Sequence, residues 1–195
     1  MYSSQRRYEE VEPLLKQALA VRQKLLGDHH SDVASSLTNL ADLYGRQRRY
    51  EEAESLFKQA LAIRQKLLGD CHADVAMSLT QLAILYSSQG RYEEAESLFK
   101  QALVMRQKLL GDRHPDVATN LFNLADLYYT MERNSESLSL IKRAISIYKQ
   151  TLGSNHPITK AAQSWLSTIS ETSEKEKERK KKGKREKGGF GVRDR

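Results

Sequence analysis

Apolar residues recur along most of this chain at the three- and four-residue spacing that places them on one face of an α-helix. The stretch from Asp74 to Leu110 shows the pattern twice, first in L-T-Q-L-A-I-L-Y and then, after a short polar break, in R-Y-E-E-A-E-S-L-F-K-Q-A-L. Each half is apolar on one side only, so each needs a neighbour to cover that side. The pattern predicts a hairpin of two antiparallel helices.

Almost everything before Thr151 is a further copy of this hairpin. Landmark residues recur every 42 positions, namely Tyr8, Tyr50 and Tyr92, then Gly27, Gly69, Gly111 and Gly153, and then His30, His72, His114 and His156. A fixed period of this size indicates stacked repeats, in which each unit buries its apolar face only against its neighbours. We therefore predict an all-α fold, an α-solenoid of antiparallel helix hairpins.

The copies divide the chain into predicted parts. A repeat array covers residues 1–170 and a disordered basic tail covers 171–195. The array consists of a partial repeat at 1–26, full repeats at 27–68, 69–110 and 111–152, and a capping helix at 156–170. The alternating Glu and Lys of that tail allow a short continuation of the helix.

The opening repeat is predicted to be incomplete. Met1 to Tyr8 align with Leu85 to Tyr92, so most of a first helix is missing, and the apolar face from Leu14 to Val21 should be poorly covered. We expect the chain to be a fragment of a longer array, or its start site to be placed too late. The uncovered face also makes end-to-end self-association an expected risk.

Polar residues predict where the helices begin and end. Each first helix should begin near an aspartate that accepts hydrogen bonds from the free amides of the first turn, namely Asp32, Asp74 or Asp116. The repeated glycines should end the second helices in a left-handed cap. The repeated histidines lie one repeat apart, about 8–10 Å, whereas zinc ligands lie about 2.0–2.3 Å from one ion. We interpret them as loop residues that aid the helix starts and predict no metal site.

Composition and charge narrow the class of protein. The chain has 195 residues, 29% of them charged, and its longest apolar runs are far shorter than the ~18–20 residues that cross a bilayer. Its single cysteine, Cys71, excludes internal disulfides. Residues 171–195 carry 11 Lys and Arg against 6 Asp and Glu, a surplus of 5 in the net charge of +7, so the body is nearly neutral. We expect a soluble cytoplasmic protein with no membrane partner.

The residue pattern resembles one known repeat family. L-x-x-L-A-x-x-Y in each first helix, followed by Ala53, Phe57 and Ala60 in the second, resembles the tetratricopeptide signature, whose usual period is about 34 residues. The longer period, with G-D-R-H-P-D-V-A and R-Y-E-E-A-E-S-L-F-K-Q-A-L, is similar to the repeats of kinesin light chains. The resemblance covers about Met1 to Ile169. It implies a right-handed superhelix whose concave groove, lined by first helices, holds a peptide or helix of a partner.

The resemblance also implies which residues line that groove. Its groove positions map onto Ser35, Thr38, Asn39, Asp42, Gly45 and Arg46, onto Met77, Thr80, Gln81, Ile84, Ser87 and Ser88, and onto Thr119, Phe122, Asn123, Asp126, Tyr129 and Thr130. The copies 27–68 and 69–110 differ at ten positions, and five of those ten belong to this set. Selection for a ligand and drift at positions free of packing both give this pattern. The mixed apolar, amide and acidic side chains predict a partner segment that is partly apolar and neutral or basic.

No catalytic motif accompanies the repeats. The glycines at 188, 189 and 191 lie in the basic tail rather than between a strand and a helix, as a phosphate-binding loop requires. We predict a non-enzymatic protein-protein interaction scaffold without a cofactor. One alternative is an adaptor that binds nucleic acid through the basic tail, whose lysines and arginines could neutralise phosphates. Another is a piece of a larger signalling or motor-adaptor protein whose effector domain lies outside this sequence.

Overall fold

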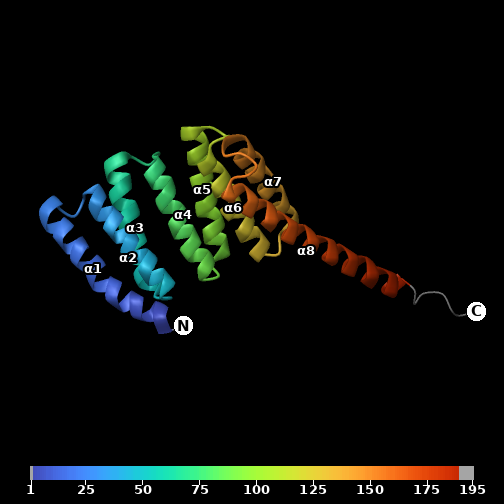
Figure 1. Ribbon diagram of the computed structural model, residues 1–195, viewed down its shortest axis with the longest axis horizontal. Coiled ribbons are helices and arrows are strands. Elements are labelled where there is room, and N and C mark those ends of the chain that lie inside the picture. The colour runs from blue at the N-terminus through green and yellow to red at the C-terminus, as the bar shows by residue number, and fades with distance from the viewer. Residues whose placement is uncertain (1, 189–195) are drawn as a thin grey trace, which may run out of the picture. The chain divides into compact units, whose positions relative to one another are not determined.

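A computed structural model confirms the all-α fold class. It describes the backbone of residues 2–188 and the side chains of residues 8–172. Within that part of the chain every regular element is a helix, as Figure 1 shows: α1 (Tyr2–Leu26), α2 (Ser31–Arg46), α3 (Tyr50–Leu68), α4 (Ala73–Ser88), α5 (Tyr92–Leu110), α6 (Pro115–Thr130), α7 (Asn134–Thr151) and α8 (Pro157–Gly188). The chain folds as two compact units, Met1–Asn120 and Leu121–Arg195, with the boundary inside α6.

In the first unit each helix packs against the next one in the chain. α1 contacts α2, α2 contacts α3, α3 contacts α4 and α4 contacts α5, and these helices follow one another side by side in Figure 1. One core cluster joins Val33 and Leu37 of α2 to Ile63 of α3, with Leu19 of α1 packed against it. Each first helix therefore contacts two second helices, the one that follows it and the one that precedes it.

The predicted apolar faces form this core. Leu37, Leu40, Ala41 and Tyr44 of α2 are all buried, and so are their counterparts in α4. Ala53 and Ala60 of α3 are 0% exposed. Alanine at these positions lets neighbouring helices approach closely, and the larger side chains beside it fill the remaining space.

Histidine, and not aspartate, caps the first helices. The Nδ1 atom of His30 accepts a hydrogen bond from the Asp32 backbone N–H at 3.1 Å, and His72 does the same for Asp74. The predicted role of the aspartates as caps was therefore wrong, although each lies in the first turn, where the helix dipole favours a carboxylate. His114 repeats the arrangement. The interpretation of the repeated histidines as helix-start residues is confirmed.

Glycine ends the second helices in a conformation that differs from the predicted left-handed cap. Gly69 has φ 78° and ψ 170°, and Gly111 has φ 82° and ψ 160°. The positive φ was predicted, but a ψ near 165° lies outside the left-handed helical region, in a region that is essentially restricted to glycine. These two positions therefore require glycine more strictly than an ordinary helix cap does.

The chain does not turn where the alignment of Met1–Tyr8 with Leu85–Tyr92 predicts. In complete hairpins the turn contains a residue of positive φ, which is 62° at Arg48 and 77° at Gly90. Arg6 aligns with Gly90, yet α1 runs without a break from Tyr2 to Leu26. A residue with a Cβ atom prefers the right-handed helical conformation, and Arg6 continues the helix at the position where Gly90 turns the chain.

The second unit contains the end of α6 together with α7 and α8. The Ser137 hydroxyl of α7 donates to the Ala125 carbonyl of α6 at 2.7 Å, and α7 packs against α8. Helical backbone continues beyond the predicted capping helix as far as Gly188, through the alternating Glu and Lys. Residues 189–195 of the predicted tail lie outside the described residues. No helix of the described chain has the length and apolar character that crossing a membrane requires.

Candidate partner-binding surface

Six of the predicted groove residues line a single hollow in the first unit, which we call the groove hollow. It has a volume of about 380 Å³ and lies over α3, between α2 and α4. Its lining residues are Asp42, Gly45, Arg46, Tyr50, Phe57, Gln81, Ile84, Leu85 and Ser88. The structure thus brings together residues that are 42 positions apart in the sequence, because α2 and α4 are equivalent helices of adjacent repeats.

The groove hollow combines an acid, an amide and an apolar side chain. Asp42 is an exposed residue, yet partial burial of its carboxyl group raises the pKa of Asp42. The positive charge of the nearby Arg46 lowers this pKa by a smaller amount. The Gln81 side-chain oxygen is buried, with no hydrogen-bond partner within the described residues. Ile84 remains 48% exposed. An incoming segment could therefore place an aliphatic side chain on Ile84 and present a positive charge to Asp42. Rotation of the Gln81 side chain would let its unpartnered oxygen accept an N–H from the segment.

Two predicted groove residues are not available to a partner. Thr38 and Thr80 are 6% and 7% exposed, and each hydroxyl donates to the backbone carbonyl four residues earlier at 2.9 Å. They support the helices from inside, and we remove them from the candidate surface. Ser35, Asn39 and Met77, by contrast, are exposed on α2 and α4.

In the second unit a residue of the capping helix contacts the predicted groove side chains. The Trp165 ring of α8 lies 5.1 Å from the Phe122 ring and 5.7 Å from the Tyr129 ring, measured between centroids. Phe122 and Tyr129 were predicted to face a partner, and in the structure both contact Trp165. Asn123 is half-buried and Asp126 is exposed. Partial burial of the Asp126 carboxyl group raises its pKa. Thr119, in the part of α6 that belongs to the first unit, is exposed.

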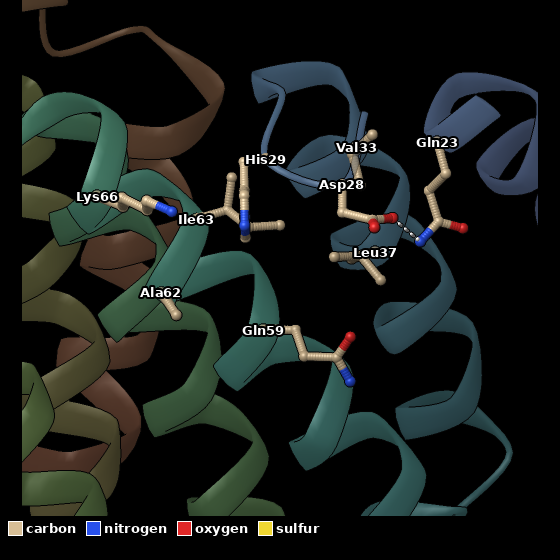
Figure 2. Close-up of a pocket in the computed structure, with 9 residues that line it drawn as sticks. All are labelled: Gln23, Asp28, His29, Val33, Leu37, Gln59, Ala62, Ile63 and Lys66. Atoms are coloured by element: carbon tan, nitrogen blue, oxygen red, sulfur yellow. Dashed lines mark hydrogen bonds between the residues drawn. The ribbon is translucent and has the colours of Figure 1, made fainter. Parts of the chain in front are cut away.

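A second kind of hollow lies beside the loops that precede the first helices, and we call it the loop hollow. Figure 2 shows it in the first full repeat, where Asp28 and His29 of the loop face Gln59, Ala62, Ile63 and Lys66 of α3. The next repeat has its equivalent, lined by Cys71, Lys100, Gln101, Val104, Met105 and Lys108. The Gln23 amide donates to Asp28 at 3.0 Å and holds the loop in place.

The two hollows account for most of the divergence between the duplicated repeats. Five of the ten differing positions are predicted groove positions. Three more line the loop hollows, namely 29/71, 62/104 and 63/105. The differences thus avoid the buried contacts between helices, apart from the conservative replacement of Ile63 by Met105.

A cluster of charged and aromatic residues that was not predicted from the sequence links the hairpin turns at Arg49 and Arg91 to the preceding second helix. The Arg91 guanidinium stacks on the Tyr86 ring at 3.8 Å and forms ion pairs with Glu54 at 2.6 Å and Glu94 at 2.7 Å. The Tyr86 hydroxyl donates to Glu54 at 3.0 Å. Arg49 makes the same contacts one repeat earlier, with Glu12 in the place of Glu54. The 42-residue spacing of Arg49, Arg91 and Arg133 was the available signal.

This cluster predicts a loss of stability in acid. Burial alone would raise the pKa of Glu54, but hydrogen bonds from Lys58, Arg91 and Tyr86 outweigh it and lower the pKa below its usual 4.5. As pH decreases, Glu54 is therefore protonated in the unfolded chain at a higher pH than in the folded chain. The contribution of Glu54 to stability begins to fall as pH decreases through 4.5, and it is lost as pH decreases through the lower pKa of the folded chain. We expect Glu54→Gln to reduce the fall in Tm between pH 6 and 3, measured by calorimetry. Superimposable pH profiles would contradict this role.

Buried arginines form a further link between repeats. Arg64 of α3 is 6% exposed, and its Nη1 atom donates to Ser78 of α4 at 2.6 Å and to Thr38 of α2 at 3.2 Å. Arg106 contacts Asn120 in the same way at 3.3 Å. Burial lowers the pKa of both arginines. Each guanidinium joins a second helix to the first helix of the next repeat. Within the described residues, no group of three or more His, Cys, Asp or Glu side chains is placed to hold a metal ion.

Comparison with known proteins agrees with the repeat geometry. The Tetratricopeptide repeat family profile matches residues 1–66, 39–108 and 74–150. This chain is a tetratricopeptide repeat protein. A search of curated proteins found no match.

Solved structures place the repeats within the family. The nearly identical TPR-like repeats of a kinesin light chain from Podosopora anserina, and a single-substitution variant of them, are both 28% identical to this chain, with TM-scores of 0.72 and 0.73. Each match covers 92% of this chain and 85% of the other. BtubC (BKLC) from P. vanneervenii, at 23% identity, a TM-score of 0.71 and coverage of 99% and 79%, shares the fold. The tetratricopeptide repeats here are of the kinesin light chain type, a fold that serves as a protein interaction scaffold.

Proposed function

We propose that this tetratricopeptide repeat protein binds a peptide or helix of a partner protein through the groove hollow and the exposed positions of α2 and α4 around it. The observation that carries the proposal is the combination, in one hollow, of the unpartnered Gln81 oxygen, the exposed Ile84 and the Asp42 carboxylate. Ligand sites are usually concave and mostly apolar, with a few placed polar groups.

The chemistry of the hollow favours a partner segment that is partly apolar and neutral or basic. Asp42 is acidic, and Asp126 occupies the equivalent position in α6. Arg46 is the one cation among the lining residues of the hollow. An acidic segment would bury its carboxylates near Asp42, and like charges in such surroundings cost free energy. A segment with a lysine or arginine beside a leucine, isoleucine or methionine would satisfy both Asp42 and Ile84.

The experiment is a selection of random twelve-residue peptides displayed on phage against the purified chain. We expect the enriched peptides to combine one or two basic residues with aliphatic ones. Asp42→Lys should raise the Kd of the best peptide by roughly 10- to 100-fold, because an attraction becomes a repulsion. Gln81→Leu should raise it by less, through the loss of one hydrogen bond.

Val104→Lys is the matched control, since Val104 is 65% exposed and lines a loop hollow on α5 instead. It should leave the Kd unchanged. Enrichment of acidic peptides would contradict the proposed chemistry. Peptides whose binding is lost with Val104→Lys and retained with Asp42→Lys would move the site to the loop hollow.

A further inference from the structure

The apolar face of α1 is open, whereas the equivalent faces of later second helices are covered. Val11 and Val21 are 41% and 48% exposed, while their counterparts Ala53 and Ile63 in α3 are 0% and 8% exposed. Leu14 is 63% exposed. Among the described helices α1 packs against α2, which covers the side that bears Leu19.

The covered equivalent in α3 shows what kind of element fits this face. There α2 packs on Ala60 and Ile63, and α2 and α3 are the two antiparallel helices of a hairpin. A helix that runs antiparallel to α1 would therefore make the same kind of contact with Val11, Leu14, Ala18 and Val21. These residues follow the three- and four-residue spacing of a two-helix seam.

The charges beside the seam are complementary to those of a second copy. Glu10, Gln17 and Lys24 are seven residues apart, so they form one exposed row along the edge of the apolar face. Read along the helix, the row is negative, neutral and positive. When two such helices run antiparallel, the row of one meets the row of the other in reverse order.

We propose that two copies of this chain associate through an antiparallel pairing of their α1 helices. In the register where Ala18 opposes Leu14 of the second copy and Val11 opposes Val21, Glu10 lies beside Lys24 of the second copy and Gln17 beside Gln17. The same register therefore buries the apolar side chains against one another and forms the ion pairs. The pairing uses α1 alone, so it is independent of the groove hollow and of the proposed function.

The first test is the mass of the full chain in solution. Sedimentation equilibrium should give a concentration-dependent species of twice the 22.3 kDa monomer. Leu14→Glu should raise the dissociation constant of the dimer by roughly 100-fold, because each dimer would bury two carboxylates. Val104→Glu on α5, at an equally exposed valine (65%), should leave it unchanged. A monomer at all concentrations, or a dimer that survives Leu14→Glu, would overturn the proposal.

The second test is of direction and register. Glu10→Lys and Lys24→Glu should each raise the dissociation constant about three- to tenfold, and the two together should restore it. In a Cys71→Ser background, which removes the only native thiol, Gln17→Cys should form a disulfide-linked dimer on mild oxidation. Ala20→Cys, two residues from Ala18 and on the far side of the helix, should not. Cross-linking through position 20 but not 17 would overturn the register.

Discussion

Replacing Arg64 by alanine should lower the free energy of unfolding by about 2–4 kcal/mol, the largest stability effect that we expect outside the apolar core. Alanine removes the buried stem of the side chain and leaves a cavity between α3 and α4. It also removes the donor that Ser78 and Thr38 share. The measurement is chemical denaturation of the full chain, followed by circular dichroism.

Arg64→Met separates the two contributions. Methionine fills most of the volume and removes a buried charge whose hydrogen bonds go to the hydroxyl groups of Ser78 and Thr38. The Ser78 hydroxyl can still donate to the Asp74 carbonyl, at 3.0 Å. We therefore expect a change within about 1 kcal/mol, since apolar replacement of buried charge is often near neutral. Equal and small effects of alanine and methionine would show that Arg64 does not link the repeats.

Replacing Gly69 by alanine should destabilise the chain by about 1–3 kcal/mol. An added Cβ would meet no atom within 4 Å, so the cost comes from the backbone conformation, φ 78° and ψ 170°, and not from a collision. For a chain of this length the loss corresponds to a fall in Tm of about 2–4 °C per kcal/mol, measured by calorimetry.

Gly90→Arg is the matched control. Gly90 has φ 77°, but Arg48 and Glu132 occupy the same turn position in the neighbouring repeats with φ 62° and 59°. The repeats themselves therefore show that this turn accepts a side chain, and we expect a cost below about 1 kcal/mol. A larger effect at Gly90 than at Gly69 would contradict the distinction between the two glycine conformations.

The sequence determined the repeat architecture by itself. The 42-residue period, the helical spacing of Leu37, Leu40, Ala41 and Tyr44, and the glycine after each second helix depend on local periodicity and on backbone preference. Such features depend on the order of residues along the chain, so they can be predicted from the amino-acid sequence alone. The same local reasoning predicted that the α1 face around Leu14 would be exposed.

Only the tertiary structure decided which side chains are available to a partner. Thr38 and Thr80 follow the groove spacing but are buried, while Phe122 and Tyr129 contact Trp165 from a helix more than thirty residues later. Histidine, and not the predicted aspartate, caps the first helices because the Nδ1 atom of His30 lies within hydrogen-bond distance of the free Asp32 amide. The burial of the threonines and the contacts of Trp165 depend on what the neighbouring helices place opposite each side chain, whereas a residue spacing gives only a direction around one helix. The histidine cap is a local contact, but it depends on the position of the Nδ1 atom, which the spacing does not give.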